Sequence, residues 1–345
     1  MTLRAGVADV LSLNPDAQSM MLGFGDLVVW PRITSGQEEF RFFASFDALN
    51  IPMPAAKRKG KSSVSIIGTG RLGTTLAVAL AAKGYAIRSL VARRVQNARK
   101  AARLLDADVQ VLAAKELRSL ICADLFLITA PDDQIPLVVR ELSEINADQK
   151  GTVLHTSGAL SSEVLAPLRE QGWHTGSMHP LMSVSAAGAA VRGAFWSVEG
   201  DRTALRVGKE IVRDLEGKSF SIRSEDKPLY HAAAVMVSGN VVALFDVALE
   251  MLGECGLDRK TARAVLLPLI ASSVRNLETK TPEESLTGTF SRGDVETVKR
   301  HLAALRNPEV KNLYRILGER SLQLANLDKD LARQIKKVLL TGLQD

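Results

Sequence analysis

The sequence predicts an α/β protein in which a doubly wound, mostly parallel sheet is followed by an all-helical C-terminal domain. Short apolar segments typical of strands alternate with helical segments between residues 62 and 223. A glycine-rich turn, 68–73, follows the first of these strands and opens the first helix. After residue 223 only helical periodicity remains. We therefore expect an N-terminal extension and linker at 1–61, a dinucleotide-binding domain at 62–223 and a helical domain at 224–345.

The strands of residues 62–223 are predicted from short apolar runs bounded by turn residues, and the helices from longer amphipathic or alanine-rich runs. Parallel strands that are covered on both faces should be apolar throughout. Pro167 is expected to kink its short helix. In chain order, the predicted elements are strand 64–67, helix 74–83, strand 86–92, helix 95–105, strand 124–129, strand 152–155, helix 163–171, a strand ending at 179–180, strand 195–199, helix 203–215 and strand 219–222.

The helical domain is expected to begin near Pro228. Proline suits the first turn of a helix, and the acidic residues Glu225 and Asp226 suit its N-terminal dipole. Glycine and proline residues further along should separate the later helices. These breaks are predicted near Gly256, Pro268, Pro282, 288–293 and Pro308.

The first 61 residues differ from the rest of the chain. They contain four prolines and little periodicity, and they end in the basic run 57–61. We expect an extension that is partly disordered or irregularly packed, ending in a charged linker. The basic run is typical of a solvated linker and could also contact a phosphate.

Composition excludes several classes of protein. A hydrophobic content of 46% is ordinary for a globular chain of 345 residues and excludes a mainly disordered or collagen-like one. The net charge of +6 suits a phosphate-bearing ligand as well as a nucleic acid. Because the basic runs are scattered and lack interleaved aromatic residues, no nucleic-acid partner is predicted. No metal site is predicted either, since His, Cys and carboxylate residues do not cluster at ligand spacing.

Cysteine usage and apolar runs predict the location of the protein. The two cysteines, Cys122 and Cys255, are far apart in the sequence and build no disulfide framework, which indicates a reducing cytoplasm. The longest uncharged apolar run, 232–245, is shorter than the roughly 18 residues of a membrane span. The N-terminus lacks the pattern of a signal peptide. We therefore predict a cytoplasmic protein with no membrane partner.

The glycine-rich turn predicts a dinucleotide site of the Rossmann type. Gly68 permits a tight turn, Gly70 allows close approach of a pyrophosphate, and Gly73 allows the helix to pack against the strand. The helix N-terminus adds amide donors and partial positive charge. The predicted cofactor-binding residues of this turn are Gly68, Thr69, Gly70, Arg71, Leu72 and Gly73.

The end of the second strand indicates which dinucleotide is bound. An NAD site would usually place a carboxylate there, whereas this chain has Arg93 and Arg94 after Ala92. A guanidinium can pair with a 2′-phosphate in bidentate fashion, so NADP(H) is predicted in preference to NAD. Ala130, Pro131 and Ser157 follow later strands at the same sheet edge and are predicted to line the nicotinamide half of the cleft.

Substrate-binding and catalytic candidates come from both domains. His179 ends a strand on the cofactor side and is predicted to lie near the substrate. Lys227 and His231 are one helical turn apart, so they share a face. A lysine at a helix N-terminus opposes the dipole, which favours proton release; the alternative is an exposed lysine beside a core histidine.

Two further substrate candidates lie beyond this pair. Asn240 is 13 residues after Lys227, about 20 Å along a straight helix, and joins its site only if the helix bends near Gly239. Arg292 lies in a glycine-bounded segment and could bind a substrate carboxylate.

Several short segments of the chain together form a recognisable set of motifs. They are 66–73, 129–135, 155–159, 179–181, 230–234 and 287–294, with His301 and Leu302. In these segments the chain resembles the Rossmann-like and DUF2520 domain family. The resemblance extends over roughly residues 62–325 and leaves the N-terminal extension outside it.

The resemblance implies more than the residues alone. The family is similar to the pyrroline-5-carboxylate reductase, F420-dependent NADP oxidoreductase and ketopantoate reductase group. This implies a homodimer whose helical domains build the active site against the cofactor. Ketopantoate reductases of the better-known type carry a helical lysine with asparagines four and eight residues later; here His231 and Val235 follow Lys227 at those positions.

Together, these features predict an NADPH-dependent oxidoreductase that transfers a hydride to a small carbonyl or imine compound, an acid such as ketopantoate. Lys227 or His231 would protonate the acceptor. The alternative is a non-catalytic NADP(H)-binding sensor that signals through its helical domain.

Overall fold

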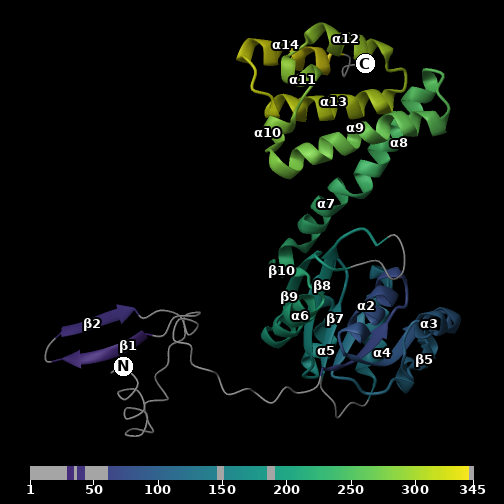
Figure 1. The fold of residues 1–345 in the computed structure, drawn as a ribbon, viewed down its shortest axis with the longest axis vertical. Coiled ribbons are helices and arrows are strands. Elements are labelled where there is room, and N and C mark those ends of the chain that lie inside the picture. The colour runs from purple at the N-terminus through teal and green to yellow at the C-terminus, as the bar shows by residue number, and fades with distance from the viewer. Residues whose placement is uncertain (1–28, 35–36, 43–60, 146–150, 185–190, 342–345) are drawn as a thin grey trace, which may run out of the picture. The chain divides into compact units, whose positions relative to one another are not determined.

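The computed structural model describes residues 29–34, 37–42, 61–145, 151–184 and 191–341 (Figure 1). The chain divides into two compact units, Met1–Lys61 and Ser62–Asp345. In the first unit, strand β1 (Val29–Thr34) pairs in antiparallel fashion with β2 (Gln37–Phe42). The expectation of an irregular segment is wrong here. The β-branched and aromatic residues of both strands, with only two residues between them, are a hairpin pattern that Pro31 obscured. The basic run 57–60 lies outside the described residues.

The second unit contains an eight-stranded sheet among its described residues. Neighbouring strands are parallel except for the antiparallel pair β8–β9, so the prediction of a mostly parallel sheet is confirmed. In sheet order the strands are β10 (Lys218–Ser221), β9 (Phe195–Gly200), β8 (His174–Leu181), β7 (Thr152–His155), β6 (Leu125–Ile128), β3 (Ser63–Ile67), β4 (Ala86–Ala92) and β5 (Gln110–Ala113).

Helices cover both faces of this sheet. Along β6, Leu125 and Leu127 pack into one apolar core while Phe126 and Ile128 pack into another, because successive strand residues point to opposite faces. The first core includes side chains of α2 (Arg71–Ala82), α3 (Val95–Ala102) and α6 (Arg202–Asp214). The second includes side chains of the 3₁₀ helix η3 (Ala114–Ser119), α4 (Ile135–Ser143) and α5 (Ala166–Glu170). This double covering explains the continuously apolar strands.

Three details of the α/β region differ from the sequence prediction. Helix α4, which connects β6 to β7, was not predicted. β5 was not predicted, because its four residues are flanked by charged residues and show little contrast with them. Pro167 does not kink a helix: it occupies the first turn of α5, where a missing amide hydrogen costs nothing, and the 3₁₀ segment η5 (Ser162–Leu165) precedes it.

Beyond β10, the 3₁₀ segment η6 (Ser224–Asp226) leads into helices, and the described residues from 227 to 341 contain no strand. Breaks near Gly256, Pro282 and Pro308 are confirmed. The predicted break at Pro268 is wrong, since α9 continues through it. In chain order the helices are α7 (Lys227–Val237), α8 (Gly239–Glu254), α9 (Arg259–Thr279), α10 (Pro282–Ser285), α11 (Thr289–Arg292), α12 (Val295–Ala304), α13 (Pro308–Leu324) and α14 (Lys329–Leu340).

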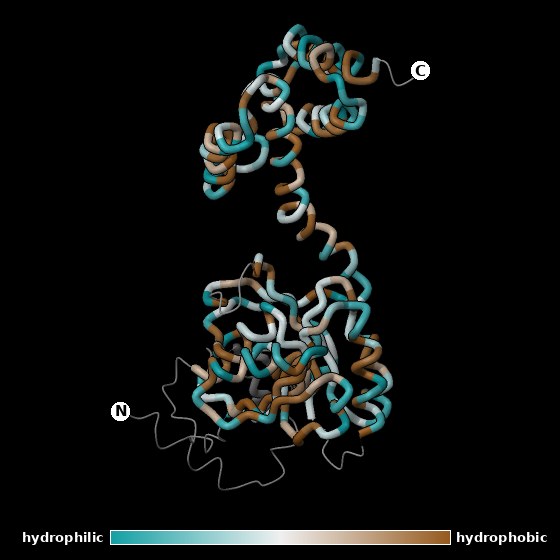
Figure 2. Tube along the Cα trace, turned by 90° about the vertical axis from the view of Figure 1, so that its right-hand side faces the viewer, coloured by the Kyte–Doolittle hydropathy of each residue, from teal (hydrophilic) through white to brown (hydrophobic). Residues whose placement is uncertain are grey.

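The segment Ser224–Glu254 is rich in hydrophobic residues (Figure 2), and several of its large apolar side chains, such as Leu229, Val237 and Val242, are exposed. By length and composition it qualifies as a candidate membrane span. A stretch of 18 residues within it has a mean hydropathy of 1.9, and only 6% of that stretch is buried. The expectation that no segment reaches this length is therefore corrected. It rested on the uninterrupted apolar run alone, whereas the helical segment extends well beyond that run on both sides. A short interruption at Ser238 separates α7 from α8 within it.

Candidate cofactor-binding and active site

The turn between β3 and α2 is built around its glycines. Gly68 has a φ of +112°, and a Cβ there would lie 2.7 Å from the backbone nitrogen of Ala130. A Cβ at residue 73 would overlap the carbonyl oxygen of Gly68, so the close approach of α2 to β3 requires glycine. At Gly70 no atom lies within 4 Å of the Cβ position. The chain itself therefore requires Gly68 and Gly73, while Gly70 leaves space at the helix N-terminus.

An open groove of about 730 Å³ runs from this turn across the carboxyl ends of the parallel strands. It passes from Gly70 and Arg93 to Ser157, His179 and His231. Of the predicted site residues, those that line it are Gly68, Thr69, Gly70, Arg71, Leu72, Arg93, Ala130, Pro131, Ser157, His179 and His231.

The end of β4 carries the two arginines of the cofactor prediction. Ala92 is buried, Arg93 is exposed and lines the groove, and Arg94 is exposed at the N-cap of α3 without lining it. Among the described residues, the groove lining contains one acidic residue, Asp132, which follows β6 and not β4. The residues that line the groove directly after β4 are Arg93 and Asn97, so a phosphate bound there would meet a cation.

The opposite end of the groove is formed by the turn at 156–161, which follows β7. Ser157 Oγ accepts hydrogen bonds from the backbone N–H groups of Ala159 (3.2 Å) and Leu160 (2.9 Å). His155 is fully buried behind it; its Nδ1 accepts from the N–H of Ser157, so Nε2 carries the proton and donates to the Ser161 carbonyl. Burial, followed by the charges of Lys227 and His179, lowers the pKa of His155 to about 3. His155 is therefore neutral at physiological pH.

Two imidazole rings from different elements pack over Gly158. The rings of His179, on β8, and His231, on α7, lie 5.5 Å apart at 83°. A Cβ at residue 158 would be 2.8 Å from Nε2 of His179 and would overlap Nδ1 of His231. His179 Nδ1 shares a 2.8 Å hydrogen bond with the hydroxyl of Tyr230, and burial is the main cause that lowers the His179 pKa to about 4. The buried Nδ1 of His231 has no hydrogen-bond partner among the described residues.

Lys227 lies behind the groove and does not line it. Its side chain is 0% exposed, and its ammonium donates to the Ser157 carbonyl (2.8 Å) and to Ser177 Oγ. The Oε1 atom of Glu199 lies 3.9 Å from Nζ. Burial lowers the pKa of Lys227 to about 8, although the charges of Glu199 and Asp132 act in the opposite direction. Lys227 and His231 thus share a helix end but have different surroundings.

Three predicted residues lie elsewhere. Gly73 packs inside the β3–α2 junction. Asn240, in α8, donates to the sulfur of Met236; although the helix is interrupted at Ser238, Asn240 does not line the groove. Arg292 is exposed at the end of α11 and does not line it either.

Glu199 was not predicted as a site residue. It lies on β9 with an exposure of 3% and accepts hydrogen bonds from Ser162 and Ser224. The sequence contained one indication of its role: Glu199 is a single carboxylate at the end of the strand 195–199, which was expected to be buried. A buried carboxylate needs hydrogen-bond or charged partners nearby.

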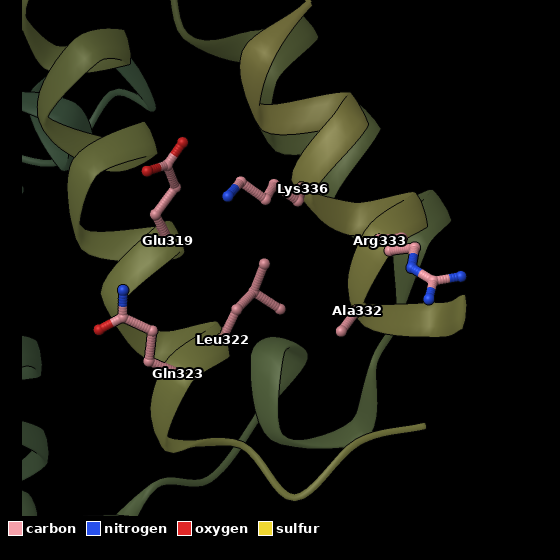
Figure 3. Close-up of a pocket in the computed structure, with 6 residues that line it drawn as sticks. All are labelled: Glu319, Leu322, Gln323, Ala332, Arg333 and Lys336. Atoms are coloured by element: carbon pink, nitrogen blue, oxygen red, sulfur yellow. The ribbon is translucent and has the colours of Figure 1, made fainter. Parts of the chain in front are cut away.

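A smaller hollow of about 200 Å³ lies between α13 and α14 (Figure 3). Its lining mixes Glu319 and Lys336 with Leu322 and Ala332, and none of the predicted site residues lies there. No group of three or more potential metal-ligating side chains occurs in the part of the chain that the structure describes.

The described residues define a class of protein in which a mostly parallel, Rossmann-like sheet with a glycine turn is followed by a helical C-terminal region. Comparison with protein families is consistent with this class. Residues 50–180 match a Rossmann-like domain, and residues 194–321 match a domain of unknown function, DUF2520. The chain is therefore a Rossmann-like and DUF2520 domain protein, as its motifs predict. A search of curated protein sequences finds no match.

Solved structures share this fold over most of their length. A Bacteroides fragilis protein provisionally assigned as an NADP oxidoreductase is 23% identical, with a TM-score of 0.62, covering 76% of this chain and 98% of its own. A reductive aminase from Aspergillus terreus, solved with NADPH and ethyl levulinate, is 15% identical, with a TM-score of 0.56 and coverages of 80% and 99%. A pyrroline-5-carboxylate reductase from Coxiella burnetii is 18% identical, with a TM-score of 0.50 and coverages of 81% and 98%. At these identities the likeness establishes the fold.

Proposed function

We propose that the protein is an NADPH-dependent oxidoreductase that reduces a small carbonyl or imine compound. The observation that carries this proposal is one groove with a glycine turn and Arg93 at one end and two imidazoles over Gly158 at the other. The similar structures support it, since they include a reductive aminase solved with NADPH and a pyrroline-5-carboxylate reductase.

The groove residues fit a dinucleotide. The space at Gly70 and the amides at the N-terminus of α2 would accept the pyrophosphate, and Arg93 would pair with a 2′-phosphate. Ala130, Pro131 and Ser157 would flank the nicotinamide. Bound NADPH supplies a hydride to the carbonyl or imine carbon.

The residues of the chain position the acceptor and supply its proton. We assign proton donation to His231, because its ring lines the groove whereas the ammonium of Lys227 is enclosed and already donates to Ser157 and Ser177. The proton goes to the oxygen or nitrogen as the hydride reaches carbon. Tyr230 fixes the ring of His179, so that the two imidazoles form one wall around the acceptor.

The cofactor and the reaction are tested together. NADPH at 100 times its dissociation constant should stabilise the fold by about 2.7 kcal/mol, and NADH should stabilise it less. Removing one charge-assisted pair in Arg93→Ala should weaken NADPH binding by about 10- to 100-fold and leave NADH binding nearly unchanged. The measurements are thermal unfolding with each cofactor and NADPH oxidation with a panel of 2-oxo acids and cyclic imines.

Arg94→Ala is the matched control, since Arg94 is exposed beside Arg93 but does not line the groove. Equal stabilisation by NADPH and NADH would show that Arg93 does not select the phosphate. Stabilisation by neither would remove the support for an oxidoreductase. NADPH binding without turnover across the panel would favour the non-catalytic sensor. Ketopantoate belongs in the panel, although His231 and Val235 depart from the asparagine pattern of the better-known ketopantoate reductases.

We further propose that the protein is a homodimer assembled through its helical domain. The apolar side chains of α7–α9 are widely exposed, Val237 at 77% and Met236 at 62%. Exposed apolar surface of this extent marks an interface. Lys227 at the start of the same segment is fully buried against the α/β domain, so we favour a second chain over a membrane as its cover. In such a dimer Asn240 and Arg292 would reach the substrate from the helical domain.

Sedimentation should give twice the monomer mass of 37.3 kDa. Val237→Asp should produce monomers, because it places a charge in the covered apolar surface. Leu104→Asp is the control: Leu104 is 58% exposed just after α3 and should leave the dimer intact. A wild-type monomer at tens of micromolar concentration, or partition of the wild-type protein into lipid vesicles, would contradict the proposal.

A further inference from the structure

Three titratable side chains are buried behind the groove without lining it: His155 on β7, Glu199 on β9 and Lys227 at the start of α7. None is more than 3% exposed. Withdrawing a charged carboxylate and ammonium from water is unfavourable, and such a pair contributes little net stability compared with an apolar replacement. All three residues hold the turn at 156–161. His155 and Lys227 form hydrogen bonds to residues of the turn, and Glu199 bonds to Ser162, the residue that follows it.

His155 and Lys227 fix the first half of this turn. His155 accepts from the N–H of Ser157 and donates to the carbonyl of Ser161, both at 3.2 Å. Lys227 donates to the carbonyl of Ser157 at 2.8 Å, across 70 residues of sequence. Both polar groups of the Ser157 backbone are therefore held by buried side chains.

Glu199 fixes the end of the turn and the start of α7 together. Its Oε1 accepts from the N–H of Ser162 at 2.8 Å, and its Oε2 accepts from Ser162 Oγ at 2.6 Å and from Ser224 Oγ at 2.8 Å. Ser162 immediately follows the turn, and Ser224 lies three residues before Lys227. The carboxylate thus links the end of the turn to η6, the 3₁₀ segment that leads directly into α7, and its Oε1 lies 3.9 Å from Nζ of Lys227.

We propose that Glu199 and Lys227 are positioning residues whose buried ion pair holds the turn at 156–161 against α7, so that Gly158 faces the imidazoles of His179 and His231. The two imidazoles pack so closely on Gly158 that a Cβ would overlap one of them, and a small shift of the turn would change their spacing. The catalytic consequence rests on the proposed reductase function, while the positioning itself does not.

The protonation state of Lys227 follows from the charges that face it. These are Glu199 on β9 and Asp132 in the 3₁₀ segment η4 (Asp132–Gln134), with His155 on β7 and His179 on β8 nearby. The pKa of about 8 keeps most of the ammonium protonated at neutral pH. Because the charge of Glu199 raises this pKa, replacing it with a neutral residue should lower the pKa of Lys227 further. A larger fraction of Lys227 would then be a neutral amine at neutral pH, with one donor hydrogen fewer.

The test compares wild type with Glu199→Gln, Lys227→Met and the double variant, with Glu170→Gln as a control on an exposed carboxylate. Two readouts need no substrate: amide hydrogen exchange of residues 156–162, and the nitrogen NMR signals of His179 and His231 as a function of pH. We expect each single variant to accelerate exchange in the turn by at least about tenfold. Deprotonation of Lys227 should change the imidazole signals, and in Glu199→Gln this change should occur at a lower pH than in the wild type.

The double variant separates positioning from stability. Removing both charges should restore the melting temperature toward the wild-type value, yet the turn should stay labile and the imidazole signals altered. Wild-type exchange and imidazole signals in the double variant, or in Glu199→Gln, would overturn the proposal. NADPH affinity, measured by fluorescence titration, should fall only modestly in these variants, because the glycine turn and Arg93 are untouched and only Ser157, beside the nicotinamide half, lies in the loosened turn. If the wild-type protein does not bind NADPH, the proposed reductase function is wrong. The hydrogen-exchange result still tests whether Glu199 and Lys227 position the turn.

Discussion

Gly70→Ala should weaken NADPH binding severely while leaving the stability of the fold intact. The backbone at Gly70 has φ −73° and ψ −165°, which alanine adopts freely, and no protein atom lies within 4 Å of the new methyl group. The methyl would instead occupy the space through which a pyrophosphate approaches the helix N-terminus. We expect the dissociation constant to rise by about 100-fold or more, which corresponds to about 2.7 kcal/mol. The free energy of unfolding should stay equal or rise by up to about 1 kcal/mol.

Gly73→Ala is the matched control in the same turn. Its methyl would overlap the carbonyl oxygen of Gly68 and the hydroxyl of Thr129, so α2 must move away from β3. We expect a loss of about 1–3 kcal/mol in unfolding free energy together with weaker binding. Chemical denaturation and fluorescence titration with NADPH measure both quantities. Wild-type NADPH affinity in Gly70→Ala would place the pyrophosphate elsewhere and contradict the cofactor assignment.

The α/β fold was predictable because its signals are local. The apolar strand before Gly68 and the turn that follows it are contiguous in sequence, and each predicts the other. β5 has no such signal, since its four residues acquire their strand conformation from pairing with β4. Pro268 shows that a local signal can also mislead. Proline by itself predicts a helix break, but α9 continues through Pro268 because the other residues of this 21-residue helix supply the remaining hydrogen bonds.

The candidate site was predictable only in part, because its polar contacts join distant segments. The sequence places Lys227 one turn from His231 and gives both the same helix face, but it does not show that the carbonyl of Ser157, 70 residues earlier, accepts from the ammonium. Glu199 is found only once β9 is paired with β8 and brought beside Ser162 and Ser224. Lys227 at a helix N-terminus conflicts with the helix dipole, and the structure places a buried carboxylate 3.9 Å from it.

Replacing His231 should separate catalysis from cofactor binding. For the compound that gives the fastest NADPH oxidation in the panel, we expect His231→Gln to lower kcat/KM by about 10²- to 10⁴-fold, the usual contribution of a positioned proton donor. NADPH affinity should change little, because the glycine turn and Arg93 lie at the other end of the groove. His301→Gln is the control, since His301 is exposed on α12, bonds to Tyr314 and does not line the groove.

Gly158→Ala tests the same arrangement without removing a titratable group. Its methyl would overlap Nδ1 of His231 and lie 2.8 Å from Nε2 of His179, so both rings must turn away while the backbone of β7 stays in place. We therefore expect Gly158→Ala to lose turnover nearly as severely as His231→Gln, with only a modest loss of stability, because side chains yield more readily than backbone. If the two variants act through one geometry, the double variant should be no worse than the poorer single one. Normal turnover in His231→Gln would show that another residue donates the proton. Normal turnover in Gly158→Ala would show that the spacing of the two imidazoles over this glycine does not matter for the reaction.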